Sequence, residues 1–311
     1  MQIAAGPTGP ELYGTQQPLG PALTEALRKP GPVMIMLHGF TFAPGHGKDC
    51  PFRHILSLDP QSRCWKALSW PREMGFGQDH EDEGLGIGFG WSARGSIWRA
   101  YRAAATAGRA LAALVDQVRC AAPDRPVHLL AHSLGARVAL SALPHLPQGA
   151  IGRMILLHPA EFGGVAAQVL ETPAGRSAEV INITSRENDL FDFLLERFIA
   201  PPARGDAALA QAMPRHPNTL TFQIDQTETL RVLGEIGFGI APPGGRICHW
   251  SAYLRPGVFD LYRALLRQPR SYPLARLRAL LPDRPDPRWS RMLRLPELRT
   301  GLSTRQRAAQ P

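Results

Sequence analysis

The sequence lacks the features of membrane-spanning, secreted and disulfide-stabilised proteins. No apolar run approaches the roughly 18 residues that a membrane-spanning helix needs. The first residues, 1–7, contain no basic segment followed by an apolar one, so we expect no secretory signal. The four cysteines show no CxxC spacing, which argues against a zinc ribbon or a disulfide framework. We therefore predict free thiols in a reducing compartment and a cytoplasmic protein.

Lysine is scarce as well, with three residues among the 35 basic ones. The net charge is +9, and residues 263–311 account for all of it, since they hold 12 Arg and three acidic residues. A nucleic-acid-binding protein usually carries its charge on a folded face with aromatic partners. A neutral body with a basic tail instead indicates an enzyme with an electrostatic arm, and we expect no nucleic-acid partner. Weak, peripheral contact of this tail with an anionic membrane is an alternative to its packing on the body.

Short, continuous apolar runs are the main signal for the fold. They occur at residues 32–37, 127–131, 154–158 and 180–184, with weaker ones at 66–70 and 219–224. Such runs are typical of buried parallel strands. Helical patterns lie between or after them, at residues 98–119, 134–146, 190–198 and 258–266. Strands that alternate with helices predict an α/β fold, with a doubly wound, mostly parallel sheet and helices on both faces.

The same pattern divides the chain into three parts. We expect residues 1–30 to be a loosely structured N-terminal segment with one short helical stretch at 22–27, or to cover an edge of the sheet, and residues 31–268 to form one α/β domain. Residues 269–311 form a basic tail rich in proline and arginine. Two stretches inside the domain, near 72–95 and 200–218, resist assignment and are long enough to be insertions over a pocket.

The most specific motif is the run AHSLG at residues 131–135, between a predicted strand and a predicted helix. It matches the nucleophile elbow G-x-S-x-G, with Ala131 in place of the first glycine. In this turn the serine hydroxyl stands clear of the sheet, and the helix N-terminus directs N–H groups at developing negative charge. We predict that Ser133 is a nucleophile. The alternative is a serine that caps the helix.

A serine nucleophile needs a base and a group that orients the base. In this architecture the acid and then the histidine follow the serine along the chain. Only His216 and His249 lie beyond a plausible acid, so they are the two candidates for the base. We favour His249, because His216 lies in a proline-rich loop. The best acid is Asp189, just beyond the strand at 180–184, although it could instead cap the following helix. Glu187 and Asp192 are the fallback acids.

The segments HGF, SWP, AHSLG, TSRENDL and CHWSAY, in this order between residues 32 and 266, resemble the α/β-hydrolase superfamily. They are most similar to a bacterial family of α/β hydrolases of unknown function. The resemblance implies a serine hydrolase that acts on esters or related acyl compounds and needs no cofactor. It also implies an oxyanion loop with one glycine followed by a bulky residue. We assign the oxyanion hole to the backbone N–H groups of Phe40 and Leu134.

These residues predict an enzyme that cleaves a carboxylic ester through an acyl-enzyme, in the manner of an esterase or lipase, with a small-molecule acyl ester as its substrate. Aromatic residues in the expected pocket loops suggest an apolar acyl site: Phe40, Phe42, Phe76, Phe89, Trp91 and Trp98. The alternatives are an acyltransferase or thioesterase with the same triad, and a non-catalytic relative that binds a lipid or a protein.

Two other segments have compositions found at ligand sites, but we expect each of them to be a loop without a ligand. The glycines of residues 84–90 alternate without the G-x-G-x-x-G spacing of a dinucleotide site, so we expect a flexible pocket flap. We expect the acidic segment 79–83 to be a solvent-exposed loop rather than a binding site for a divalent cation. We accordingly expect neither a cofactor nor a metal.

Overall fold

The computed structural model describes residues 1–61 and 63–293 of the chain. Within this part eight strands form one sheet in the order β2-β1-β4-β3-β5-β6-β7-β8. Only β1 and β2 are antiparallel, and every other neighbouring pair is parallel. The predicted α/β fold with a mostly parallel sheet is therefore confirmed. The strands are β1 (Gln2–Ala5), β2 (Pro10–Leu12), β3 (Val33–Leu37), β4 (Leu85–Gly90), β5 (Val127–His132), β6 (Arg153–Leu157), β7 (Glu179–Thr184) and β8 (Thr219–Gln223).

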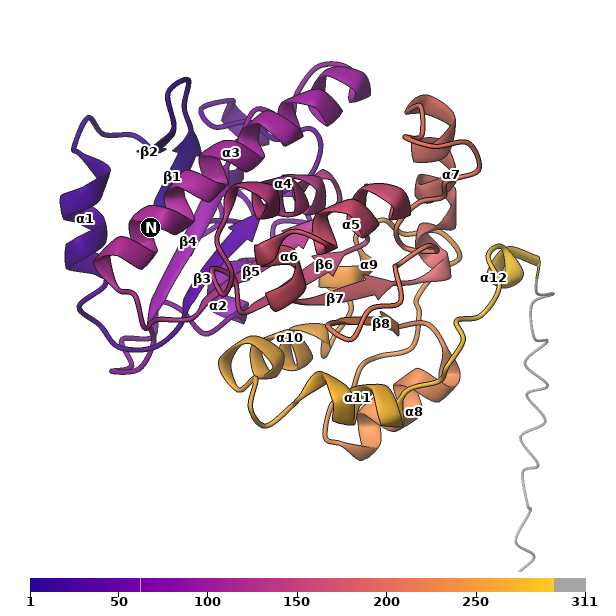
Figure 1. The fold of residues 1–311 in the computed structure, drawn as a ribbon. Helices are drawn as coiled ribbons and strands as arrows, with labels where there is room; N and C mark the ends of the chain where they lie inside the picture. The colour runs from indigo at the N-terminus through magenta and orange to yellow at the C-terminus, as the bar shows by residue number, and fades with distance from the viewer. Residues whose placement is uncertain (62, 294–311) are drawn as a thin grey trace, which may run out of the picture.

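Helices cover both faces of the sheet (Figure 1). One face packs against α1 (Leu19–Ala26), α3 (Ile97–Ala121), α4 (Leu134–Ala142), α5 (Gly163–Leu170) and α6 (Pro173–Ser177). The other packs against α2 (Trp70–Glu73), α8 (Thr227–Glu235), α9 (Ser251–Leu254), α10 (Val258–Arg267) and α11 (Leu274–Leu280). In β3, Ile35 belongs to the first core and Met34 to the second. Burial on both faces explains why these strands are continuously apolar.

Residues 1–30 are not loose: β2 and β1 lie at one edge of the sheet, and the helical stretch expected at 22–27 corresponds to α1. β1 pairs in parallel with β4, and Ile3 is fully buried between the sheet and its helices. Leu23 of α1 is buried in the same core. β1 has four residues and its antiparallel partner β2 has three. Strands this short show no clear period, so they could not be recognised in the sequence.

The glycine-rich segment within 72–95 is also different from the expected flap, because it forms β4 between β1 and β3. A Cβ atom at Gly86 would lie 2.8 Å from the Phe76 ring, and one at Gly90 would lie 2.7 Å from the Phe52 ring. The glycines therefore let aromatic side chains pack directly on the strand backbone. The weak strand expected at 66–70 is absent: residues 66–69 form a turn and coil that lead into α2.

The described part of the tail packs on the body. Leu274 and Leu277 of α11 are buried, and Arg288 pairs with Glu196 at 2.9 Å. The short helix α12 (Ser290–Leu293) follows, and the remaining tail, residues 294–311, lies outside the described residues. Contact of this tail with an anionic membrane stays a prediction. No helix in residues 1–61 and 63–293 is long and apolar enough to cross a bilayer.

Candidate active site

Ser133 occupies a sharp turn between a strand and a helix. β5 ends at the residue before it and α4 begins at the residue after it. Its backbone has φ 55° and ψ −124°, a conformation that residues with a side chain rarely adopt. The turn is held by the Ser133 N–H, which donates to the Leu157 carbonyl at 3.0 Å. Strain of this kind costs about 1–3 kcal/mol and is common at functional sites.

Two glycines give the turn the space that it needs. A Cβ atom at Gly39 would lie 2.7 Å from the Ser133 Cβ, and one at Gly135 would lie 2.7 Å from the His38 carbonyl oxygen. The close approach of the β3 loop to Ser133 and α4 thus depends on both positions. Ala131 stands where the motif usually has its first glycine, and it is fully buried without a break in β5.

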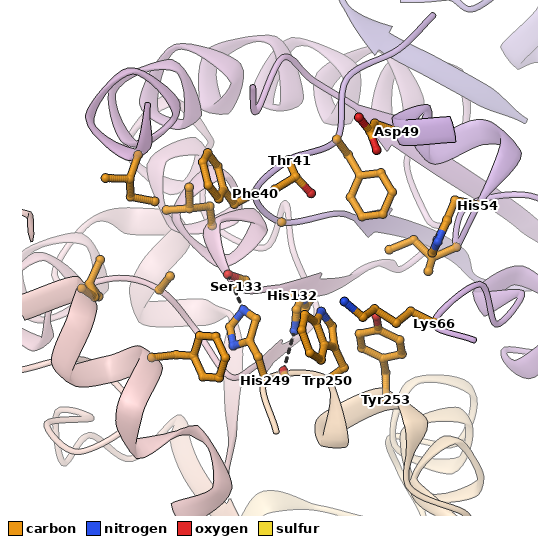
Figure 2. A pocket seen from close by; sticks show the side chains of 18 of the residues that line it. Phe40, Thr41, Asp49, His54, Lys66, His132, Ser133, His249, Trp250 and Tyr253 are labelled. Carbon is orange, nitrogen blue, oxygen red and sulfur yellow. Dashed lines mark hydrogen bonds between the residues drawn. The ribbon is translucent and has the colours of Figure 1, made fainter. Parts of the chain in front are cut away.

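The Ser133 hydroxyl forms the first link of a hydrogen-bonded chain. His249 Nε2 lies 3.0 Å from Ser133 Oγ, and His249 Nδ1 lies 2.7 Å from Asn188 Oδ1 (Figure 2). Since an amide oxygen only accepts hydrogen bonds, the proton of the neutral imidazole is on Nδ1. Nε2 is then left as an acceptor that faces the serine hydroxyl. This is the arrangement that a general base requires.

Asp189, the acid expected from the sequence, does not contact His249. Its Oδ2 accepts a hydrogen bond from the Trp289 backbone N–H at 2.6 Å, on the side of α7 (Asp189–Phe198) that packs against the tail. The residue before it, Asn188, faces the histidine instead. The side chains of successive helical residues point about 100° apart. When Asn188 faces His249, the side chain of Asp189 therefore points in a different direction.

The turn that presents Asn188 is fixed by two buried ion pairs. Arg186 binds Asp225 at 2.7 Å, and Glu187 binds Arg255. The Glu187 carbonyl also accepts the Cys248 N–H at 2.8 Å, which ties this turn to the loop that carries His249. Glu187 is thus engaged elsewhere and does not take the role of acid.

Asp192, the other fallback acid, is connected to His249 only through Asn188. Its Oδ1 accepts a hydrogen bond from Asn188 Nδ2 at 2.9 Å, which turns the amide oxygen of Asn188 toward His249. Burial raises the pKa of Asp192 to about 8, so its carboxyl is mostly neutral at pH 7. No charged carboxylate therefore touches His249 through this chain.

Two further histidines hold the backbone at His249. Nε2 of His132 lies 3.1 Å, and Nδ1 of His158 lies 2.9 Å, from the His249 carbonyl oxygen. The three rings have ligand atoms within 4.8 Å of one another, a grouping that could suit a metal such as zinc. However, these nitrogens and both nitrogens of His249 are already hydrogen-bonded. The cluster suits a brace for the base better than a metal centre.

The electrostatics of the site keep these imidazoles uncharged. Burial lowers the pKa of His132 to about 3 and that of His158 to about 4. The pKa of His249 lies well below its usual 6.5, mainly because of burial and then because of His132, His158 and Lys66. His249 is accordingly neutral at pH 7, in the protonation state of a base.

The two N–H groups assigned to the oxyanion hole lie at the pocket beside Ser133. Phe40 and Leu134 both line this pocket. Their N–H groups donate to no acceptor in the part of the chain that the structure describes, whereas the Thr41 N–H donates to the Ala93 carbonyl at 2.9 Å. His38 braces the loop, because its Nδ1 donates to the Gly39 carbonyl and its Nε2 accepts the Trp91 N–H at 3.0 Å.

The pocket above Ser133 has a volume of about 700 Å³. One wall comes from α7 and is apolar: it contains Phe191, Leu194, Leu195 and Phe198. The opposite wall comes from the loops between β3 and α2 and is more polar: it includes Lys48, Asp49, His54 and Lys66. Neither predicted insertion, 72–95 or 200–218, lines this pocket.

Several residues singled out in the sequence lie elsewhere. Among the aromatic residues expected at the pocket, Phe40 and Phe42 line it, while Phe76, Phe89 and Trp91 belong to the core. His216 bonds to Asn218 beside a second, more polar cavity. Sequence reasoning missed Asn188 and Lys66. The signal for Asn188 was its place beside Asp189, and the signal for Lys66 was the scarcity of lysine.

Among the comparisons with known proteins, the family match agrees with the fold. The model of a family described as alpha/beta hydrolase of unknown function (DUF900) matches residues 70–159, which include β4, α3 and the turn with Ser133. No curated protein matches the chain. Among solved structures, the mature form of Bacillus licheniformis lipase BlEst2 is 13% identical, with 83% of this chain and 96% of that chain covered and a TM-score of 0.42.

Proposed function

We propose that this chain, an α/β hydrolase by its fold and its family match, is a serine esterase that cleaves carboxylic esters through an acyl-enzyme. The observation that carries the proposal is the hydrogen-bonded chain from Ser133 through His249 to Asn188, at the floor of a largely apolar pocket. A serine at a strained turn, beside a neutral imidazole, is the arrangement used for acyl transfer.

In the proposed reaction, Ser133 Oγ attacks the ester carbonyl while His249 Nε2 takes its proton. The negative charge that forms on the carbonyl oxygen is stabilised by the N–H groups of Phe40 and Leu134. The tetrahedral intermediate then collapses, and His249 returns the proton to the departing alcohol. Water attacks the acyl-enzyme with His249 as base, which releases the acid and restores Ser133. An alcohol or thiol in place of water would make the same site an acyltransferase.

Asn188 has a specific part in this scheme. Its amide oxygen accepts the Nδ1 proton and holds the ring in the tautomer that leaves Nε2 free. Unlike a carboxylate, an amide carries no charge to balance the imidazolium that forms during the reaction. The site therefore relies on orientation and on the oxyanion hole more than on a counter-charge.

The pocket predicts a preference for longer acyl chains. Each methylene buried against the α7 wall contributes about 0.8 kcal/mol, or roughly fourfold in kcat/KM. We expect kcat/KM for p-nitrophenyl esters to rise from acetate to a medium chain and then level off as the pocket fills. A steady fall from acetate onward would contradict an open acyl pocket and indicate a small ester or amide substrate.

The depressed pKa of His249 predicts a pH dependence. The base acts only when it is neutral, so kcat/KM is lost as the pH falls through the pKa of His249. Because that pKa lies well below 6.5, full activity should persist from neutral pH to below about pH 6.5. The profile of kcat/KM on a neutral ester, from about pH 4 to about pH 9, measures this directly. An acid limb centred above pH 7 would show that the base is not in the environment described.

A further inference from the structure

Two of the three lysines in this arginine-rich chain line the same pocket. Lys48 and Lys66 both belong to its polar wall, while Lys29 lies elsewhere and pairs with Asp79 at 3.3 Å. Lysine differs from arginine in being a compact, strongly hydrated charge that can turn toward a single acceptor. The positions where the chain keeps lysine are thus concentrated at the candidate active site.

Lys66 has an environment that leaves its charge unbalanced. Its ammonium lies 3.2 Å from the centre of the Trp250 ring and 5.4 Å from that of Trp65. Among the described residues, no carboxylate lies within the 4 Å of an ion pair. The side chain is half-buried. Figure 2 shows it extending into the pocket, with its nitrogen toward His132 and Trp250. The aromatic face supports the cation but does not neutralise it.

The rest of the pocket carries no free negative charge that would compete for this cation. Asp49 is the one acidic residue among the lining residues described, and it is paired with Arg94. The nearest carboxyl of the catalytic chain, Asp192, is mostly neutral at pH 7 because burial raises its pKa to about 8. An anion that enters the pocket therefore meets positive charge from Lys66 and, at the exposed rim, from Lys48.

The location of Lys66 places that charge close to the reacting groups. In Figure 2, Lys66 and His54 lie together on one side of the Ser133–His249 pair. The α7 wall supplies only apolar residues to the pocket. A substrate with an apolar part and an anionic part can satisfy both walls at once. Close to the reacting groups Lys66 presents one positive charge, since Lys48 lies at the exposed rim, and one charge is balanced by the single negative charge of a carboxylate.

We propose that Lys66 is a specificity residue that binds a carboxylate on the substrate, so that the natural substrates are esters of carboxylate-bearing acyl groups. This inference rests on the proposed esterase function and adds the substrate class to it. Binding of the carboxylate also cancels the charge of Lys66 beside His249, which otherwise opposes protonation of the imidazole during the reaction. The anionic substrate thereby favours its own turnover as well as its binding.

The test compares two p-nitrophenyl esters with the same number of carbons, the monoester of adipate and the ester of hexanoate. The former ends in a carboxylate and the latter in a methyl group. The quantity measured is the ratio of kcat/KM for adipate to kcat/KM for hexanoate, after subtraction of spontaneous hydrolysis. We expect Lys66→Met to lower this ratio about tenfold relative to wild type. Lys66→Arg, which keeps the charge, should retain most of the ratio.

Lys29→Met is the matched control, because it removes a lysine that lies outside the pocket, and it should keep the wild-type ratio. The wild-type ratio should also fall as ionic strength rises. A ratio that Lys66→Met leaves unchanged would overturn the inference. So would equal losses on both esters, since these indicate that Lys66 merely supports Trp250. If the folded wild type hydrolyses neither ester, the proposed function fails and the inference fails with it. If it hydrolyses the hexanoate ester but not the adipate ester, the proposed function stands and only the inference fails.

Discussion

Replacement of Ser133 by alanine is expected to lower kcat/KM for a p-nitrophenyl ester on the order of 10³-fold or more, while the protein stays folded. The reason is that the acyl-enzyme forms on Ser133 Oγ, which lies 3.0 Å from the base His249. The loss of the hydroxyl removes both the nucleophile and the proton that His249 accepts. Alanine also fits the turn sterically, so circular dichroism and the unfolding midpoint should change little.

The control for this variant is Ser177→Ala on α6, outside the pocket, where the hydroxyl donates to the carbonyls of its own helix and accepts the Gly149 N–H at 2.8 Å. Its kcat/KM should equal that of the wild type. If folded Ser133→Ala retained wild-type turnover, the mechanism would be wrong despite the geometry. If both variants lost activity together, the loss would come from unfolding of the protein and not from removal of the nucleophile.

The second large effect is expected at Asn188. Asn188→Ala removes the acceptor that holds the Nδ1 proton of His249, so the imidazole can rotate or adopt the wrong tautomer. We expect kcat to fall on the order of 10²-fold, with a smaller change in KM. Asn188→Asp keeps an acceptor oxygen at the same place and should retain activity, because the mostly neutral carboxyl of Asp192 can donate to the new carboxylate.

Asp189→Asn is the matched comparison, because it changes the neighbouring residue. Its side chain accepts the Trp289 N–H, which an amide oxygen can also do. We expect kcat to change by no more than about threefold. The reverse pattern, with Asp189→Asn inactive and Asn188→Ala active, would show that Asp189 is the acid after all.

The elbow was predictable because all its determinants are local in sequence. A buried strand, a serine, a glycine two residues later and an immediate helix follow one another within residues 127–138. His249 followed from the chain order of the motif, and the structure brings it to Ser133. The partner of His249 could not be fixed in this way. Asn188 and Asp189 are adjacent, and the choice between them depends on the Arg186 and Glu187 ion pairs with distant residues.

The pocket was less predictable, since its walls come from segments far apart in the chain. Residues 84–90 have the composition of a flap, yet residues 85–90 form β4, because their glycines accommodate rings from other segments. Lys66 lies on a loop with no pattern of its own. Its proximity to Trp250 is a property of the folded chain, and the sequence shows only that lysine is rare.

The most direct test of the proposal is covalent labelling with a fluorophosphonate. An activated serine oxygen attacks the phosphorus and displaces fluoride, so the intact protein gains the mass of one phosphonyl group. Peptide mapping should place that group on Ser133, and folded Ser133→Ala should remain unlabelled. A folded wild-type protein that stays unmodified, or one labelled on another residue, would contradict the assignment of Ser133 as the nucleophile.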